Sequence, residues 1–331
     1  MAERGHFVAV YCRERHSEAS YRGVRLIYLP TWRHKYFDTI VHTFLSTIHL
    51  IFHRSDVALY CNAANAIFTF WPRIFGIPAA LNVDGLERNR RKWNRLAKAW
   101  YLISERLATF CPSVVVTDAR KIAEYYLARY GKHSEFIPYG AETEKLETAD
   151  VLTQLGLERG RYILYVSRME PENNALLVRE AFEKTSTPMK MALIGDAPYA
   201  QEYIQRVRAT SHPRVVMPGA IYGRGYHELQ SHCFAYIHAT EVGGTHPALI
   251  EAMGRGALVL YLNTPENAEV AGSAGIPFEA GELCEKLNLI LGMQEAERAE
   301  WGRRAQERVA QRYSWKAVTD QYEALLLQLR H

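Results

Sequence analysis

Short runs of β-branched and aromatic residues recur along the first 140 residues, and stretches with apolar side chains at helical spacing separate them. Each run has the length and composition of a buried strand. The predicted strands are residues 7–12, 25–29, 56–61, 78–83 and 113–117. Residues 39–52, 93–110 and 119–130 repeat apolar positions at intervals of three and four, which is typical of helices. This alternation of strand and helix predicts a parallel sheet.

The same rhythm restarts after a polar, acidic stretch at residues 141–150. The strands expected in the second half are residues 162–167, 190–195, 214–217, 234–238 and 257–261. Residues 295–330 are predicted to be helical with a break near Tyr313, where Ser314 is suited to cap the final helix. A second doubly wound domain is the simplest account of this pattern.

These patterns predict two Rossmann-like α/β domains. The expected parts are a first domain at residues 1–140, a linker at 141–153, a second domain at 154–312 and a final helix, 315–330, that packs back on the first domain. The 331 residues, with 48% apolar and 23% charged side chains, leave room for two cores of about 150 residues each. If the two domains face each other, the ends of their strands meet at a shared cleft, where ligands should bind.

No apolar stretch reaches the roughly 20 residues that a bilayer span needs. The first residues, MAERGHF, lack the apolar core of a secretion signal, so we expect a cytoplasmic protein. The 5 cysteines are widely spaced and form no Cys-x-x-Cys pair, which argues against a disulfide framework or a zinc knuckle. We therefore expect no structural metal.

Charge is distributed unevenly along the chain. Residues 1–140 hold 20 Lys and Arg against 11 Asp and Glu, whereas residues 141–331 hold 20 against 25. A basic first half suggests an anionic partner, such as a phosphate-bearing substrate, an acidic lipid surface or a nucleic acid. A nucleic acid is disfavoured because the basic residues do not interleave with aromatic residues in a recognised binding pattern. Charge scattered over a solvated surface remains an alternative.

The most informative segment is EVGGTHPALIEAMGRG, residues 241–256, which follows a predicted strand and enters a helix. Gly243 and Gly244 permit a tight turn, and Pro247 suits the first helical position. The free N–H groups of such a helix N-terminus favour a phosphate. Glu251 follows about one turn later, where a carboxylate can accept hydrogen bonds from a sugar diol. An ordinary strand-to-helix turn explains the same residues.

Two further strand ends carry candidate chemistry. In SRMEPENN, residues 167–174, Arg168 offers a planar, permanently charged fork that suits a diphosphate. The alternative is a surface arginine paired with Glu170 or Glu172. In IGDAP, residues 194–198, a glycine at the strand end lets a base or ribose approach closely. Together with the preceding segment, these strand ends predict a nucleotide-diphosphate site.

These segments resemble the family 4 glycosyltransferases, which are retaining enzymes of the GT-B fold. In the C-terminal half the resemblance rests on residues 137–142 (IPYGAE), 162–174, 193–198, 241–254 and 313–318 (YSWKAV). In the N-terminal half, residues 30–46 and 82–100 (NVDGLERNRRKWNRLAKAW) resemble a bacterial subgroup that contains rhamnosyltransferases of polysaccharide assembly. The resemblance implies an acceptor-side domain followed by a donor domain.

The resemblance further implies transfer of a sugar, rhamnose in that subgroup, from a nucleotide diphosphate-sugar to a glycan or lipid-linked acceptor. The anomeric configuration would be kept, without a metal or other cofactor. The catalytic residues would be Arg168, Gly243, Gly244, Thr245 and Glu251. Other donor-binding residues would be Ser167, Asn173, Gly195, Asp196, Glu241 and His246. The acceptor side would carry Asp84, Glu87, Arg88, Arg91 and Lys92.

The chain departs from the family pattern at several positions. Many relatives have a glutamate where Gly243 stands, eight positions before Glu251, and here Glu241 lies nearby. A lysine of the relatives is replaced by Asn173, and a histidine before the acceptor-side aspartate is replaced by Val83. Relatives also begin with a strand and a glycine-rich loop that this chain lacks, so we expect an incomplete N-terminal domain. The alternative function is a truncated, catalytically weak or inactive relative that binds a nucleotide or a membrane.

The predicted helix at residues 93–110 has an apolar face. This face comprises Trp93, Leu96, Ala97, Trp100, Ile103, Ser104 and Leu107, with Arg91, Arg95 and Lys98 beside it. Such a helix could dock on anionic lipids at the inner face of the membrane, or grip the diphosphate of a lipid-linked acceptor. A helix that faces the core and keeps a solvated edge fits the same pattern.

Overall fold

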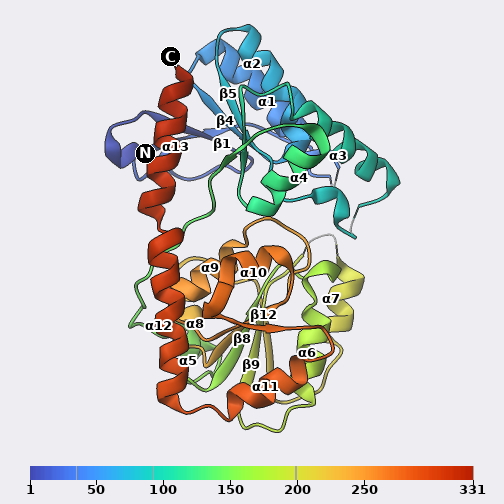
Figure 1. Ribbon diagram of the computed structural model, residues 1–331, viewed down its shortest axis with the longest axis vertical. Coiled ribbons are helices and arrows are strands. Elements are labelled where there is room, and N and C mark those ends of the chain that lie inside the picture. Colours follow the sequence, from blue (N-terminus) through green and yellow to red (C-terminus); the bar gives the residue numbers. More distant parts are fainter. Residues whose placement is uncertain (35, 92, 198–199, 331) are drawn as a thin grey trace. The chain divides into compact units, whose positions relative to one another are not determined.

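The chain folds into two compact units, which Figure 1 presents in a computed structural model. The structure describes residues 1–331 except Lys35, Lys92, Pro198, Tyr199 and His331. Unit 1 comprises Met1–Asn89, Trp93–Ile137 and Thr319–His331, and unit 2 comprises Arg90–Lys92 and Pro138–Val318. The chain thus contributes three residues, 90–92, to unit 2 before it completes unit 1.

Unit 2 is built on one six-stranded sheet with the strand order β10-β9-β8-β11-β12-β13 (Figure 1). Its strands are β8 (Tyr162–Val166), β9 (Lys190–Ile194), β10 (Val215–Gly219), β11 (Ala235–His238), β12 (Val259–Leu262) and β13 (Ile276–Phe278). All neighbours pair in parallel. From β8 the chain builds outward to β10 and then returns to β11 on the other side of β8. Ligands of such sheets bind at this reversal, outside the carboxyl ends of the strands.

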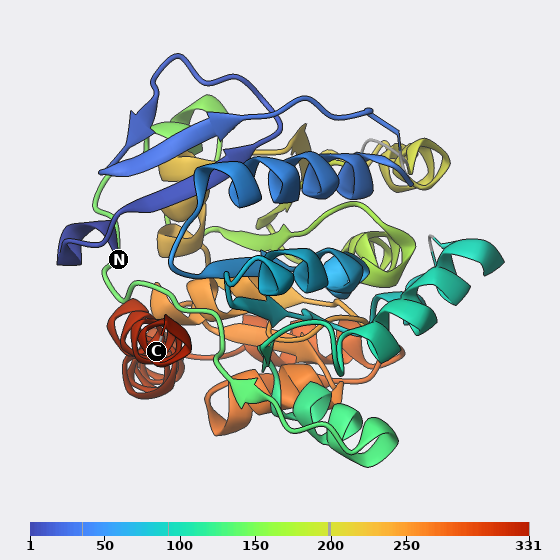
Figure 2. The ribbon, with the colours of Figure 1, turned by 90° about the horizontal axis from the view of Figure 1, so that it is seen from above.

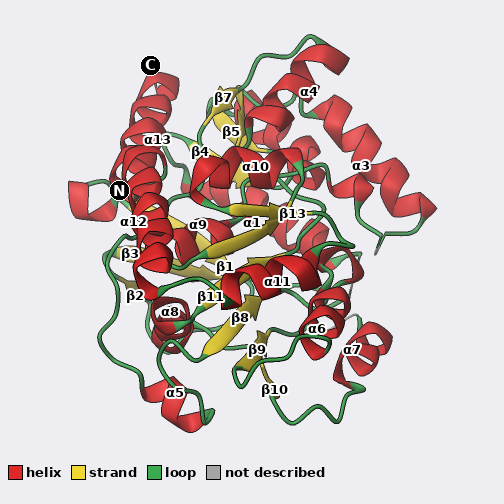
Figure 3. Ribbon diagram, turned by 60° about the horizontal axis from the view of Figure 1, so that its bottom comes forward, coloured by secondary structure: helices red, strands yellow, loops and turns green. Residues whose placement is uncertain are grey.

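Helices cover both faces of this sheet (Figure 3). One face packs against α6 (Ala175–Glu183), α7 (Gln201–Arg208) and α11 (Leu283–Leu291). The other packs against α5 (Asp150–Gln154), α8 (Gly223–His232), α9 (Pro247–Gly254), α10 (Pro265–Ala271) and α12 (Glu295–Arg312). Because both faces are buried, the central strands are continuous apolar runs and show no alternation of polar residues.

Unit 1 has two separate sheets. The first contains β1 (Val8–Cys12), β2 (Ser20–Tyr21) and β3 (Val24–Tyr28) in the order β1-β3-β2. The second contains β4 (Ala58–Cys61), β5 (Ala79–Asn82), β6 (Val114–Thr117) and β7 (Glu135–Phe136) in sequence order. Helix α1 (Asp38–His53) leads from the first sheet to the second, as can be followed in Figure 2. The single parallel sheet expected from the strand pattern is therefore divided, because no ladder among the described strands joins β1 to β4.

Of the remaining helices of unit 1, α2 (Phe70–Ile74) and α4 (Arg120–Tyr130) contact strands of the second sheet. Helix α3 (Arg95–Leu107) contacts the 3-10 turns at Ala63–Thr69 and Glu87–Asn89, and the end of α13 (Trp315–Arg330) also belongs to this unit. Shorter 3-10 turns over the whole chain are η1 (Ala2–Arg4), η2 (Ala63–Thr69), η3 (Glu87–Asn89), η4 (Pro171–Asn173) and η5 (Gly272–Ala274). The core of unit 1 lies around Leu50, Leu81 and Tyr126. Within unit 1, Asn82 Nδ2 donates to the Tyr322 hydroxyl of α13 at 2.9 Å.

Every strand predicted from the sequence is present in the structure. The predicted helix break is confirmed too, and the Ala317 N–H donates to the Ser314 side chain at 3.3 Å. The stretch at residues 141–153, expected to be a linker, belongs to unit 2. It is held there because Val151 and Leu152 of α5 are buried in the core of that unit.

The face of α3 differs from the prediction. Leu96 and Ile103, expected on one apolar face with Ser104, are 81% and 53% exposed, whereas Ser104 and Glu105 are buried. The helix is turned this way because the buried Glu105 carboxylate accepts hydrogen bonds from Arg88 Nε at 2.8 Å and from the Tyr125 hydroxyl at 2.8 Å. A buried charge with these partners outweighs the exposure of two aliphatic side chains.

Candidate functional site

Three loops meet at the reversal point of the unit 2 sheet. They are residues 167–174 after β8, residues 195–197 after β9 and residues 239–246 before α9. Backbone hydrogen bonds join them: Ser167 N–H to Ile194 O at 3.1 Å, Met169 N–H to Asp196 O at 3.2 Å, and Glu241 N–H to Glu172 O at 2.9 Å. The strand ends singled out in the sequence therefore form one connected site within unit 2.

Gly195 allows two of these loops to approach each other. Its φ is +146°, and an added Cβ would lie 1.8 Å from the Ser167 carbonyl oxygen. No other residue fits without moving backbone. The sequence predicted close approach of a ligand at this glycine, and the structure adds close approach of the neighbouring loop. The next residue, Asp196, is exposed, and its Oδ1 accepts from the Ala197 N–H at 2.8 Å.

Arg168 and Asn173 have different roles in the first loop. Arg168 is exposed, and the described residues give its guanidinium no ion pair or hydrogen bond. Asn173 is 4% exposed, and its Nδ2 donates to the Arg168 carbonyl oxygen at 2.6 Å. Ser167 Oγ donates to the same carbonyl at 2.9 Å. The arginine is therefore available to an anion, while Asn173 and Ser167 fix the loop that presents it.

The loop before α9 ends in a helix N-terminus without a side-chain cap. His246 is the N-cap residue and makes no capping hydrogen bond, and Pro247 follows at the first helical position. Gly243 packs on the His246 ring, because an added Cβ would lie 2.3 Å from His246 Cε1. Gly244 and Thr245 between them are buried. Helix N–H groups at such an end remain available to an anion.

His246 is uncharged at neutral pH. Burial lowers its pKa to about 3, with the positive charges of Arg90 and Arg168 acting in the same direction. Its ring lies 4.8 Å from the ring of His238, whose pKa burial also lowers strongly. Two neutral imidazoles thus support the start of α9, and neither adds a positive charge to it.

Glu251 is held by a residue that the sequence did not point to. The Tyr226 hydroxyl of α8 donates to Glu251 Oε2 at 2.6 Å, and Gln230 Nε2 donates to the same hydroxyl at 2.8 Å. Burial raises the pKa of Glu251, and the hydrogen bond from Tyr226 opposes that rise. Tyr226 lies on another helix, so no local motif could have identified it.

Both carboxylate oxygens of Glu241 accept hydrogen bonds from neighbouring side chains. Its Oε2 accepts from Arg91 Nη2 at 2.8 Å, and its Oε1 accepts from Asn174 Nδ2 at 3.0 Å. Arg91, predicted on the acceptor side, belongs to unit 2. Its ion pair ties Arg91 to the loop before α9.

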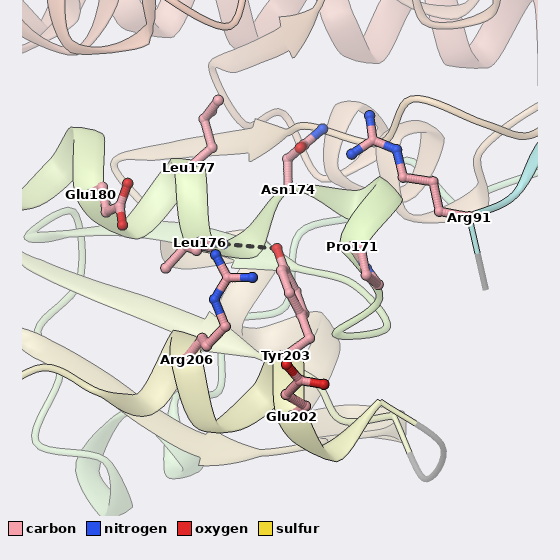
Figure 4. Close-up of a pocket in the computed structure, with 9 residues that line it drawn as sticks. All are labelled: Arg91, Pro171, Asn174, Leu176, Leu177, Glu180, Glu202, Tyr203 and Arg206. Carbon is pink, nitrogen blue, oxygen red and sulfur yellow. Dashed lines mark hydrogen bonds between the residues drawn. The ribbon is translucent and has the colours of Figure 1, made fainter.

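A pocket of about 410 Å³ opens beside the same loops, between the starts of α6 and α7 (Figure 4). Its lining residues are Arg91, Pro171, Asn174, Leu176, Leu177, Glu180, Glu202, Tyr203 and Arg206. The Tyr203 hydroxyl accepts from the Leu176 N–H at 3.1 Å and closes one side (Figure 4). Among the residues proposed from the sequence, Arg91 lines this pocket, whereas Arg168, Glu251 and the α9 loop do not.

Three of the acceptor-side residues predicted from the sequence, Asp84, Glu87 and Arg88, lie in unit 1. Asp84 adopts a left-handed conformation with φ 58°, and its N–H donates to Asn82 Oδ1 at 2.9 Å. Glu87 is buried and accepts from Trp93 Nε1 at 3.3 Å. Arg88 forms a salt bridge with the buried Glu105. Lys92 lies outside the described residues.

In the described part of the chain, no three His, Cys, Asp or Glu side chains gather as a group that could hold a metal ion. No described helix combines the length and the apolar character that a membrane span requires.

Two family models match the chain. Residues 152–308 match the family described as Glycosyl transferases group 1, and residues 53–142 match a domain of unknown function, DUF1972. The first match contains Arg168, the loop before α9 and Glu251. The chain is a glycosyltransferase. No curated protein sequence matches this glycosyltransferase.

Solved structures share the fold of this glycosyltransferase. Sucrose-phosphate synthase from Thermosynechococcus elongatus superposes with a TM-score of 0.78 at 18% identity, covering 99% of this chain and 90% of that chain. A glycosyltransferase from Rickettsia africae gives 0.76 at 14% identity, with 99% and 91% covered. Anabaena HepE in complex with UDP and glucose gives 0.74 at 17% identity, with 93% and 87% covered. The fold is the expected α/β GT-B type with Rossmann-like domains.

Proposed function

We propose that this glycosyltransferase is a retaining enzyme that uses a nucleotide diphosphate-sugar. The observation that carries the proposal is the convergence of an unpaired arginine, Arg168, with the uncapped N-terminus of α9 at the reversal point of the unit 2 sheet. Both features favour a diphosphate. The complex of Anabaena HepE with UDP and glucose supports the same ligand class.

In the proposed reaction, the bond between the anomeric carbon and the diphosphate oxygen breaks, and a bond to an acceptor hydroxyl oxygen forms on the same face. The proton of that hydroxyl passes to the leaving diphosphate, which departs as the nucleoside diphosphate. The main catalytic effect is electrostatic stabilisation of the leaving diphosphate. Arg168 and the N–H groups of Gly243, Gly244 and Thr245 supply it, while Glu251 binds the ribose. Because Asn173 stands where relatives have a lysine, this site has one cation fewer. The proposed chemistry uses no metal or other cofactor.

We further propose that the donated sugar is rhamnose and that the acceptor is a glycan or lipid-linked glycan of cell-surface polysaccharide synthesis. The resemblance of residues 82–100 to rhamnosyltransferases supports this. In unit 1, the exposed side chains of Leu96 and Ile103 lie on the same helix as Arg95 and Lys98, which suits peripheral contact with an anionic membrane from the cytoplasmic side.

The test is an assay of the purified chain with UDP-, dTDP- and GDP-sugars, in which both hydrolysis and transfer are measured. We expect turnover with one nucleotide class and a product whose anomeric configuration matches the donor. Arg168→Ala and Glu251→Ala should each weaken nucleotide binding about tenfold. Arg206→Ala, on α7, should leave nucleotide binding unchanged. Binding without turnover would favour an inactive nucleotide-binding relative. Absence of binding to every nucleotide-sugar would refute the proposal.

A further inference from the structure

We infer that Tyr226 is a positioning residue of the donor site, which holds the Glu251 carboxylate in the orientation that binds the ribose. This inference rests on the proposed function, because it assigns the ribose of a nucleotide to Glu251. Tyr226 lies on α8 and Glu251 on α9, and the two helices are in contact. The hydrogen bond of 2.6 Å between them is the only one that the Glu251 carboxylate makes with the described residues.

The direction of this hydrogen bond is fixed by Gln230. Gln230 is 1% exposed, and its Nε2 donates both to the Tyr226 hydroxyl at 2.8 Å and to the Ala248 carbonyl oxygen at 3.3 Å. An amide nitrogen can only donate, so the Tyr226 oxygen accepts from Gln230. Its single proton is then available only to Glu251. The relay therefore runs from Gln230 through Tyr226 to Glu251.

The relay leaves enough of the carboxylate free for a diol. A carboxylate has about four lone-pair positions, and Tyr226 occupies one of them, on Oε2. Two hydroxyl groups of a ribose can donate to the positions that remain. A protonated carboxyl would instead have to donate, and it would lose one of the acceptor positions. Ribose binding should therefore be tightest while Glu251 is ionised.

The surroundings of Glu251 make Tyr226 important for that ionisation. Burial raises the pKa of Glu251, and the Tyr226 hydrogen bond lowers it. The charges of His227 on α8 and Arg255 after α9 also lower it, and the Tyr236 hydroxyl of β11 lies near the carboxylate as well. Removing the Tyr226 hydroxyl takes away the one partner in direct contact, so the pKa of Glu251 should rise further.

The experiment measures binding of UDP and of 2′-deoxy-UDP to the whole chain between about pH 5 and pH 8. In the wild type, UDP should bind more tightly than 2′-deoxy-UDP. Tyr226→Phe should weaken UDP binding about tenfold, shrink the preference for the ribose form, and move the loss of affinity on acidification to a higher pH. Gln230→Ala should change the UDP affinity, the ribose preference and the pH of affinity loss in the same direction by smaller amounts. It replaces Tyr226→Phe as the test if that variant does not fold.

The matched control is Tyr162→Phe. Its hydroxyl donates to the Leu229 carbonyl oxygen of the same helix α8 at 2.7 Å, and it does not touch Glu251. This variant should lose stability but keep the wild-type pH profile and ribose preference. The inference is overturned if Tyr226→Phe also keeps the wild-type pH profile and ribose preference, while Glu251→Gln loses the ribose preference. A wild-type chain that binds neither UDP, dTDP nor GDP would instead refute the proposed function. One that binds only dTDP, whose sugar lacks the 2′-hydroxyl, would overturn this inference and leave the proposed function standing.

Discussion

The two units differ most in how many large apolar side chains they leave in contact with solvent. Among the described residues of unit 2, the exposed large apolar side chains are Tyr222, Leu289 and Trp315. Unit 1 exposes such side chains along α1, α2 and α3, including Phe52 at 80% and Trp71 at 50%. The arrangement of the strands accounts for this difference, because the sheet of unit 2 is continuous and covered on both faces, whereas that of unit 1 is divided.

The difference indicates that the two units have different roles. Unit 2 holds the connected loops of the candidate donor site on a well-packed core. Unit 1 combines exposed apolar side chains with the basic part of the sequence, and surfaces of that kind favour amphipathic, anionic partners. We therefore expect the folding stability of unit 2 to come mainly from apolar packing. Polar contacts should contribute a larger share of the stability of unit 1.

The largest expected effect comes from the core of unit 2. Phe182 on α6 is 0% exposed, and Phe182→Ala should lower the free energy of unfolding by about 3–5 kcal/mol through lost burial and a cavity. Phe52→Ala in unit 1, where the ring is 80% exposed, is the matched control and should change it by less than about 0.5 kcal/mol. Chemical unfolding measures both. Similar losses in the two variants would contradict the comparison.

A smaller effect is expected from the polar cluster of unit 1. The Glu105 carboxylate is buried and accepts hydrogen bonds from Arg88, Tyr125 and Tyr130. Glu105→Gln keeps the shape and removes the charge, which should cost about 2–3 kcal/mol. Glu124→Gln, at an exposed ion pair on α4, should cost almost nothing. An unchanged unfolding transition in Glu105→Gln would show that unit 1 does not depend on this cluster.

Acid should destabilise unit 2 through the buried His238 and the half-buried His246. The pKa of His246 is lowered to about 3 and that of His238 well below its usual value, while both are near 6.5 in the unfolded chain. Below about pH 6.5 the unfolded state binds more protons, so each histidine should remove about 1 kcal/mol of stability per pH unit. His238→Asn should flatten the measured pH dependence of unfolding. His53→Asn, exposed on α1, should leave it as it is.

The smallest effect is expected where the start of unit 1 meets α13. Glu323 accepts hydrogen bonds from His6 and Arg4, and these lower its pKa. This contact should stabilise unit 1 above the unfolded pKa near 4.5 and lose its effect as pH falls through the lowered value. Glu323→Gln should slightly lower the thermal midpoint at neutral pH, and the difference should vanish in acid. A difference that persists in acid would assign the effect to something other than charge.

Local signals account for what the sequence could predict. A buried strand is a contiguous run of apolar residues, so the longer strands of both units could be predicted, and so could the strand ends that carry Arg168 and the loop before α9. The strands β2, β7 and β13 are two or three residues long, too short for such a run, and the sequence did not predict them. The partners of these groups come from other elements. Nothing near Glu251 in sequence indicates Tyr226, and nothing in the basic run at residues 88–92 indicates that Arg88 pairs with Glu105 while Arg91 pairs with Glu241.

The division of the strands of unit 1 also bears on how copies of the chain associate. Seven strands in two sheets have four outer strands, β1, β2, β4 and β7, where one sheet would have two. An outer strand presents unpaired N–H and C=O groups to strands of other molecules. When one outer strand pairs with a different one on the next copy, the contact is head-to-tail and need not close. Because β2 and β7 are only two residues long, they offer little edge for such pairing, and any pairing between copies of the chain is expected at the longer strands β1 and β4.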